Sequence, residues 1–237
     1  MKIAARAKTA TQRLWALCRG ETATLASLLE ARSPAWPLTC AIVIILGCGT
    51  YGGAIGLWRA PLQAGFTAIK MPLLIFLTWG GNALLNGLLA QILGAELSFR
   101  QTALTILMSF TIAALLLGAL SPVALFILAN TPPLGSTARG TGHSVTLLAD
   151  VGMIAYAGIL ANRRLMSLLR HLCPTPEIAQ RVFWAWLAGN LFFGAQVSWI
   201  LRPFVGSPAL AVEFLRSDPL RGNFYEAVYR AVKHLIF

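Results

Sequence analysis

Long apolar runs alternate with short polar segments along most of this 237-residue chain. A helix that crosses the ~30 Å hydrocarbon core of a bilayer needs about 20 apolar residues, and the runs approach that length. The predicted spans cover residues 37–58, 71–94, 102–125, 144–162 and 183–201. In the third span the apolar run continues to Ala129 past Pro122, which either kinks this helix or ends it. The pattern predicts an all-α, polytopic transmembrane helix bundle of about five spans.

Helical periodicity also marks the two tails outside the spans. In residues 1–36 the stretch TQRLWALCRGETATLASLLEAR places Leu14, Cys18 and Leu25 near helical spacing, with arginines alongside. Residues 202–237 end in NFYEAVYRAVKHLIF, which repeats this pattern. We expect both tails to form amphipathic surface helices that lie along the membrane or pack on a partner subunit.

A further amphipathic stretch, RAPLQAGFTAIKMPLL, joins the first two spans. Pro61 and Pro72 bracket this stretch, and Arg59 and Lys70 lie near its two ends. The pattern predicts a short interfacial helix that these two cations anchor at the membrane surface.

The composition supports a membrane location. Hydrophobic residues make up 57% of the chain and charged residues only 11%, with a mean hydropathy of +0.70, whereas about a quarter of the residues in soluble domains are charged. Lysine and arginine number 19 against 8 acidic residues. The basic residues lie beside the apolar runs, which favours contact with anionic membrane lipids over nucleic-acid binding. We expect one membrane domain, residues 37–201, without a soluble domain.

The distribution of basic residues predicts an orientation. With the N-terminus in the cytoplasm, 11 of the 19 basic residues fall inside and 8 outside. The excess favours a cytoplasmic N-terminus in a bacterial inner membrane. The basic C-terminal tail opposes this orientation, and an even number of spans would remove the conflict.

Motifs for catalysis or metal binding are missing from the sequence. His143, His171 and His234 fall outside the spans, so no intramembrane histidine is present to ligate haem. The 4 cysteines include no C-x-x-C pair, and no zinc-protease, phosphate-loop or nucleophile-elbow motif is found. We expect no enzyme activity, no cofactor and no metal site.

One acidic residue, Asp150, interrupts the fourth span. It lies six residues into the span, about 9 Å deep at 1.5 Å per residue, which is too deep for its short side chain to reach the headgroups. Inserting a charged Asp at the centre of a helix costs about 2.5 to 3.5 kcal/mol, and protonating it at neutral pH costs roughly 4 kcal/mol. We therefore expect Asp150 to point into the bundle, on a face shared with Thr146 and Ala157.

Other polar residues lie at similar depths when the spans alternate in direction. Tyr51, Thr78 and Gln196 lie about 7 to 12 Å below the same face as Asp150, and Asn82 and Asn190 lie about 16 Å below it. We expect these residues to form a polar intramembrane layer. Interhelical hydrogen bonds are sufficient to explain such a layer, and a binding site for an ion, a proton or a polar solute is the alternative.

Two basic residues lie near this layer at the outer face. We expect Arg202, at the outer rim, to reach toward Asp150 and form an ion pair. His143 precedes Asp150 by seven residues and falls on the same stripe. This histidine is either a surface residue or the mouth of a path for protons or cations.

Glycines are concentrated in the outer half of the first span, in the stretch GCGTYGGAIG. Gly49 with Gly53, and Gly52 with Gly56, stand in small-x-x-x-small register. This register favours close contact with a neighbouring helix. A helix that bends or contacts a substrate is the alternative.

Two stretches resemble known bacterial membrane proteins. APLQAGFTAIKMPLL, followed by an apolar span and GAELSFRQTALTILMS, resembles the bacterial members of the Ypt-interacting-protein family of five-span membrane proteins, over residues 59–164. GAQVSWILRPFVGSP, residues 194–208, resembles uncharacterised bacterial multispan proteins with a Q-x-x-W-x-L-R-P-F element. The first resemblance implies a non-enzymatic protein that acts through protein or lipid contacts, and it implies no catalytic residue.

These observations favour an accessory or scaffold subunit of a membrane complex. Its partners would be membrane lipids and other membrane-protein subunits, or a second copy of the chain. A small transporter or channel component with a polar site around Asp150 is the alternative.

Overall fold

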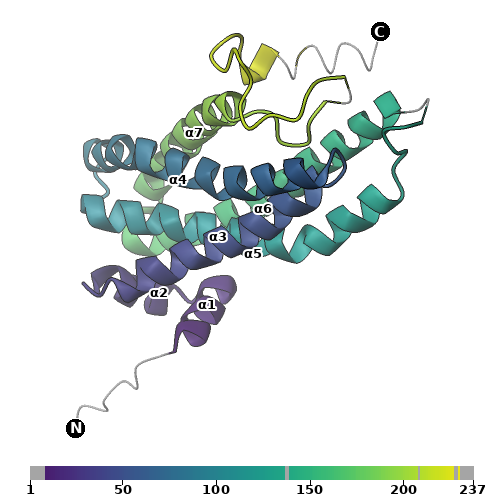
Figure 1. The fold of residues 1–237 in the computed structure, drawn as a ribbon. Coiled ribbons are helices and arrows are strands. Elements are labelled where there is room, and N and C mark those ends of the chain that lie inside the picture. The colour runs from purple at the N-terminus through teal and green to yellow at the C-terminus, as the bar shows by residue number, and fades with distance from the viewer. Residues whose placement is uncertain (1–8, 137–138, 208, 227–228, 230–237) are drawn as a thin grey trace.

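A computed structural model describes residues 9–136, 139–207, 209–226 and 229 of the chain. Within these residues the protein contains seven α-helices and no strands, so the predicted all-α fold is confirmed (Figure 1). The helices are α1 (Ala10–Arg19), α2 (Thr22–Glu30), α3 (Ala35–Gly56), α4 (Pro61–Ile92), α5 (Phe99–Ala129), α6 (Arg139–Leu172) and α7 (Pro176–Ile200).

Four helices are long and apolar enough to cross a membrane. They cover Ala35–Gly56, Pro61–Ile92, Phe99–Ala129 and Gly142–Leu172. At most 39% of the most apolar stretch in each of these helices is buried inside the protein, and large apolar side chains such as Leu46 and Leu84 are exposed. A bilayer is the environment that accommodates so much outward apolar surface. The chain is therefore a multi-pass membrane protein.

The segment between α3 and α4 differs from the expected interfacial helix. The helix that begins at Pro61 continues through Pro72 to Ile92 without interruption, and Lys70 is fully buried within the protein. Prolines are tolerated inside membrane helices because neighbouring helices and local adjustments compensate for the missing hydrogen bond. α5 likewise continues through Pro122, which neither ends nor interrupts it.

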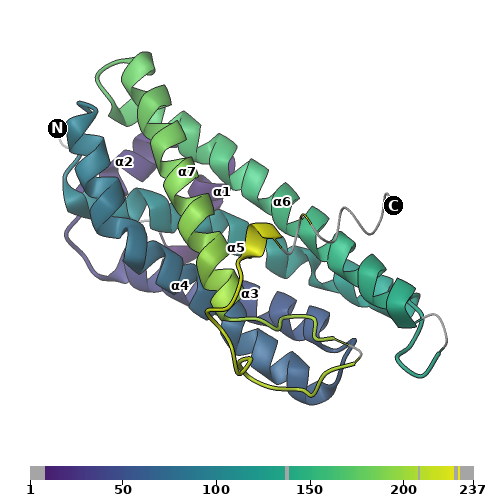
Figure 2. The same ribbon diagram turned by 90° about the horizontal axis from the view of Figure 1, so that it is seen from above.

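The long helices pack as a bundle in which α5 contacts α3, α4 and α6. α3 packs against α4 and α5, and α7 packs against α4 and α6. Figure 2 shows α7 running between α4 and α6 in the view from above. One apolar core lies mainly between α3 and α5, and a second lies around α7 and the neighbouring ends of α4 and α6.

The N-terminal segment forms two short helices beside the bundle (Figure 1). Gly20 separates α1 from α2 and adopts a left-handed conformation with φ of 72°, which glycine adopts without steric cost. Leu17 and Leu29 are buried against the bundle. Arg100 of α5 donates hydrogen bonds to the carbonyl oxygens of Leu29, at 2.7 Å, and of Ala31, and so fixes the end of α2.

The segment after α7 has little regular structure. Residues 201–207 and 209–216, which we call the strap, run back along α4, where Arg59 and Lys70 bind their carbonyl oxygens. Most of the stretch expected to form the C-terminal amphipathic helix lies outside the described residues.

Candidate functional site

A buried hydrogen bond joins the first and fourth predicted spans. The hydroxyl group of Tyr51 in α3 donates to Oδ1 of Asp150 in α6 at 3.3 Å. The exposed fractions of these two residues are 0% and 5%. Oδ2 of Asp150 is also buried and has no hydrogen-bond partner among the described residues. Asp150 thus points into the bundle, and one of its two carboxyl oxygens has no partner among the described residues.

The residues near Asp150 on α6 do not extend this interaction. Thr146 is buried and donates to the carbonyl oxygen of Gly142 in its own helix. His143 is half-buried, and its ring lies 5.6 Å from that of Trp58, centroid to centroid. Its Nδ1 has no hydrogen-bond partner among the described residues. His143 and Asp150 are seven residues apart, about 10 Å along the helix, and no described hydrogen bond connects them.

A second polar cluster joins α4 to α7. The Nδ2 groups of Asn82 and Asn86 both donate to Oδ1 of Asn190, each at 3.1 Å. Asn82 also donates to the carbonyl oxygen of Gly189 at 3.0 Å, and Nε1 of Trp186 donates to the carbonyl oxygen of Asn86 at 2.9 Å. Asn82 and Asn190, which were predicted to lie at the same depth, are therefore joined by a hydrogen bond. Asn86 was not singled out from the sequence, although it follows Asn82 by one helical turn.

The expected polar layer is divided between these two clusters. Thr78 is buried beside Gly194 of α7, where a Cβ atom on the glycine would lie 3.5 Å from Thr78 Cγ2. Gln196 is half-buried, and its side chain makes no hydrogen bond with any described residue. No hydrogen bond between described residues connects the Asn82 cluster with Asp150. The arrangement consists of two separate interhelical contacts rather than one continuous layer.

The expected ion pair between Arg202 and Asp150 is wrong. The guanidinium group of Arg202 lies 3.9 Å from the ring centroid of Trp199 and donates to carbonyl oxygens of the segment that follows α7. The accepting residues are Trp199, Asp218, Pro219 and Arg221. Because the chain turns back after α7, these carbonyl groups surround the guanidinium group, and Asp150 pairs with Tyr51 instead.

The partner of Lys70 was not predicted from the sequence. Its Nζ donates to the carbonyl oxygen of Pro203 at 2.8 Å. The same atom lies 4.9 Å from the ring centroid of Phe214 and 6.0 Å from that of Phe204. Aromatic faces and a carbonyl oxygen thus compensate in part for burial of this amine. All three residues that surround Lys70 belong to the strap.

Lys70 is the last of a row of donors on one face of α4. Nε2 of Gln63 donates to the carbonyl oxygens of Pro203 and Phe204, at 3.0 and 2.8 Å, and the Thr67 hydroxyl donates to that of Phe204 at 2.7 Å. Arg59, which precedes the helix, binds the carbonyl oxygens of Ser207 and Leu210 at 3.1 and 3.0 Å. The signal in the sequence is the spacing of these four donors, at intervals of four, four and three residues.

The glycines of α3 lie at its contacts with two other helices. A Cβ atom at Gly52 would lie 2.4 Å from the carbonyl oxygen of Thr67, and one at Gly56 would lie 2.7 Å from Cα of Ala64. At Gly49 and Gly53 the nearest atoms of α4 would lie at 3.4 and 3.9 Å, which are ordinary contacts. The close backbone contacts with α4 therefore depend on Gly52 and Gly56.

Gly47 makes the corresponding contact with α5. A Cβ atom at this position would lie 2.2 Å from the carbonyl oxygen of Ala114. On the α5 side of the contact, a Cβ atom at Gly118 would lie 3.0 Å from Cα of Gly47. The glycines of α3 thus allow it to pack tightly against α4 and α5 at the same time.

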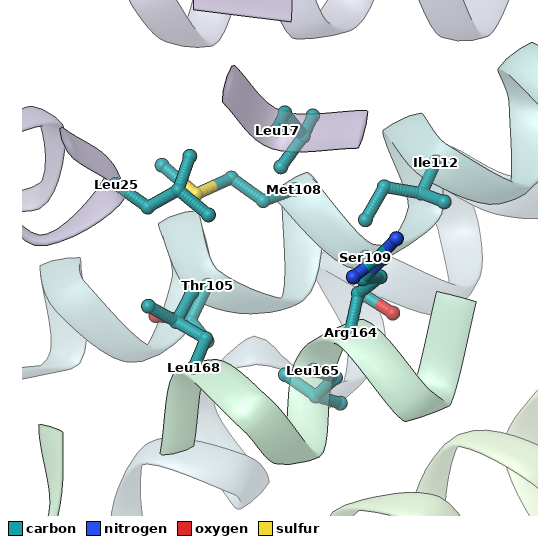
Figure 3. A pocket seen from close by; sticks show the side chains of 9 residues that line it. All are labelled: Leu17, Leu25, Thr105, Met108, Ser109, Ile112, Arg164, Leu165 and Leu168. Carbon is teal, nitrogen blue, oxygen red and sulfur yellow. The ribbon is translucent and has the colours of Figure 1, made fainter. Parts of the chain in front are cut away.

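A small pocket lies where α1 and α2 meet α5 and α6. Figure 3 shows the side chains that line it, among them Leu17, Ser109 and Arg164. Its free volume of about 10 Å³ is close to the minimum for one water molecule. The pocket is therefore too small to bind a substrate.

Comparison of the chain with protein-family models, with curated proteins and with solved structures finds no match.

Proposed function

We propose that this protein is a non-enzymatic, multi-pass membrane protein that acts as an accessory or scaffold subunit of a membrane complex. The observation that carries the proposal is a row of small residues on the outward face of α6. A Cβ atom at Gly152 or at Gly158 would have no neighbouring atom within 4 Å, and Ala155 between them is exposed. The glycines of α3 differ from these, because Gly47, Gly52 and Gly56 lie against neighbouring helices of the same bundle.

Helices associate in lipid mainly through close packing, because lipid tails are as apolar as leucine side chains and supply no hydrophobic drive. Small residues permit the necessary approach of two backbones. Inside the bundle, Gly47 and Gly52 serve this purpose. The small residues on the outward face of α6 suit a helix of a partner subunit or of a second copy.

We further propose that α7 is a fifth crossing of the membrane. Its 25 residues extend over about 37 Å at 1.5 Å per residue, and it packs against two helices that are long and apolar enough to cross. Trp184, Leu191 and Phe192 are exposed on its outer face, at 58 to 62%. With five crossings the two termini lie on opposite sides of the membrane, and the distribution of basic residues favours an N-terminus in the cytoplasm of a bacterial cell, with α1 at the inner surface of the inner membrane. This arrangement agrees with a five-span protein similar to the Ypt-interacting-protein family.

Purification in a mild detergent, followed by mass spectrometry and measurement of the molar mass, tests the subunit proposal. The wild-type protein is expected to retain a partner subunit or a second copy. Gly152→Leu should lose this partner, because leucine keeps the helices apart. Gly65→Leu is the matched control, because Gly65 also faces outward without neighbouring atoms, on α4. Recovery of the wild-type protein as a lone monomer would exclude the subunit role.

The unpartnered Oδ2 of Asp150 supports one alternative, a small transporter or channel component. Asp150→Asn distinguishes the two functions. Lost proton-linked or ion-linked flux in proteoliposomes, with unchanged assembly, favours transport. Lost assembly without any effect on flux favours the subunit role.

A further inference from the structure

Three exposed arginines lie at the end of the bundle where α3 begins and α6 ends. They are Arg32, just before α3, and Arg163 and Arg170, in the last third of α6. None of the three forms a hydrogen bond or an ion pair with any residue that the structure describes. Their guanidinium groups are therefore free to bind a ligand outside the protein.

The arginines at the opposite end behave differently. Arg59, Arg202 and Arg216 each donate to backbone carbonyl oxygens of the chain that follows α7. These guanidinium groups hold the strap and the residues after it in place. Arg59, Arg202 and Arg216 are thus occupied by the chain itself, whereas Arg221 at that end is exposed and its side chain has no described partner.

A crossing of α6 that begins at Gly142 would bring the three arginines to the level of the lipid headgroups. From Gly142 to Arg163 the α6 helix rises about 32 Å, and the 22 residues of α3 rise about 33 Å. Both lengths match the ~30 Å thickness of a hydrocarbon core. Arg163 and Arg32 therefore lie where the hydrocarbon ends, and Arg170 lies about 10 Å further along the helix.

The position of α1 gives independent support for this depth. A Cβ atom at Gly20, at the end of α1, would lie 3.0 Å from Nη1 of Arg164, so α1 ends level with this part of α6. Trp15 of α1 is 60% exposed, and the guanidinium group of Arg19 lies 5.5 Å from its ring centroid. Exposed tryptophans are enriched at the boundary between headgroups and hydrocarbon.

We propose that Arg32, Arg163 and Arg170 form a basic surface that binds the phosphate groups of anionic phospholipids. These lipids would belong to the leaflet on the side of the membrane where α1 lies. A guanidinium group forms paired hydrogen bonds with phosphate oxygens, and the headgroup level brings phosphates within its reach. This inference rests on the membrane-spanning part of the proposed function and deepens it, since it names the lipid class that the protein contacts. It does not depend on a partner subunit.

The test compares lipids that differ only in headgroup charge. Separate samples of the purified full-length protein are mixed with phosphatidylglycerol, with phosphatidylcholine that has the same acyl chains, or with inorganic phosphate. Native mass spectrometry counts the bound lipids, and a thermal-shift assay measures stabilisation. Phosphatidylglycerol should bind in excess over phosphatidylcholine and raise the melting temperature, whereas inorganic phosphate should not.

The triple variant R32Q/R163Q/R170Q should lose at least about fivefold in preference for phosphatidylglycerol. R221Q is the control, because Arg221 is exposed at the opposite end and its side chain has no described partner. Equal binding of both lipids, an equal loss in R221Q, or the same melting shift with inorganic phosphate would overturn the proposal. If the triple variant does not fold, R163Q alone is compared with R221Q under the same criteria. Because lipid adducts are counted on the monomer, absence of a partner subunit does not affect the result.

Discussion

Tyr51 and Asp150 lie 99 positions apart in the sequence, and a 3.3 Å hydrogen bond joins their side chains inside the bundle. It links α3, whose main neighbours are α4 and α5, to α6, whose main neighbours are α5 and α7. A hydroxyl donor is well suited to this position, because a buried carboxyl group without a partner is costly in lipid. The pair therefore contributes to the packing of α6 on the bundle, whether or not Oδ2 binds another group.

Tyr51→Phe removes the only hydrogen bond that the carboxyl group of Asp150 makes to another described residue. It should destabilise the protein by about 1 to 3 kcal/mol, the usual cost of leaving a buried polar group unsatisfied. Thermal or denaturant unfolding in detergent measures this change. Tyr156→Phe is the control, since Tyr156 lies on α6 with 54% exposure. Equal effects of the two substitutions would show that the hydrogen bond contributes nothing.

Lys70→Met should loosen the strap. Methionine has a similar length but neither the donor that binds the carbonyl oxygen of Pro203 nor the charge that faces Phe214. We expect faster trypsin cleavage after Arg216, and a larger effect in the double variant K70M/Q63L, because Gln63 binds the same carbonyl oxygen. Ile69→Met is the matched control, because Ile69 is 59% exposed and faces away from the strap. Unchanged cleavage in the double variant would show that these donors do not hold the strap.

Gly52→Ala should destabilise the contact between α3 and α4. Its Cβ atom would lie 2.4 Å from a backbone oxygen that cannot move freely, and overpacking of this kind costs about 1 to 3 kcal/mol. Gly65→Ala should be neutral or slightly stabilising, because open space surrounds Gly65 and alanine favours helix more than glycine does. Unfolding of both variants in detergent measures the difference. A Gly52→Ala variant as stable as wild type would contradict the close packing.

The positions of the long helices followed from the sequence, because an apolar run of membrane length is recognised by its composition alone. The depth of the polar residues was predicted from the same runs. Depth is only one coordinate, however, and the choice of partner depends on which helices are neighbours. Asn82 meets Asn190 because α4 packs on α7, and Asp150 meets Tyr51 rather than Arg202.

Lys70 shows a second reason why the sequence was insufficient. A lysine beside an apolar run is typical of a cation that extends to the membrane surface, and its neighbours in the sequence favour that interpretation. The carbonyl group that binds it belongs to Pro203, 133 residues later. Pro72 contributed to the same error, since a proline inside a membrane helix does not have to end it.

Maleimide labelling tests the position of α1 and the proposed orientation together. Cys18 is exposed on α1, whereas Cys40, Cys48 and Cys173 are buried. Labelling of the folded protein should therefore occur at Cys18 and disappear in Cys18→Ser. Although the residue is exposed, partial desolvation of the Cys18 thiol by its neighbours raises its pKa above the ordinary value, and the nearby Arg164 opposes this shift only in part. Because the thiolate is the reactive form, the rate should be low at neutral pH and should rise as the pH increases toward 9. In intact bacterial cells a reagent that cannot cross the inner membrane should leave Cys18 unlabelled, and labelling by that reagent would reverse the proposed orientation.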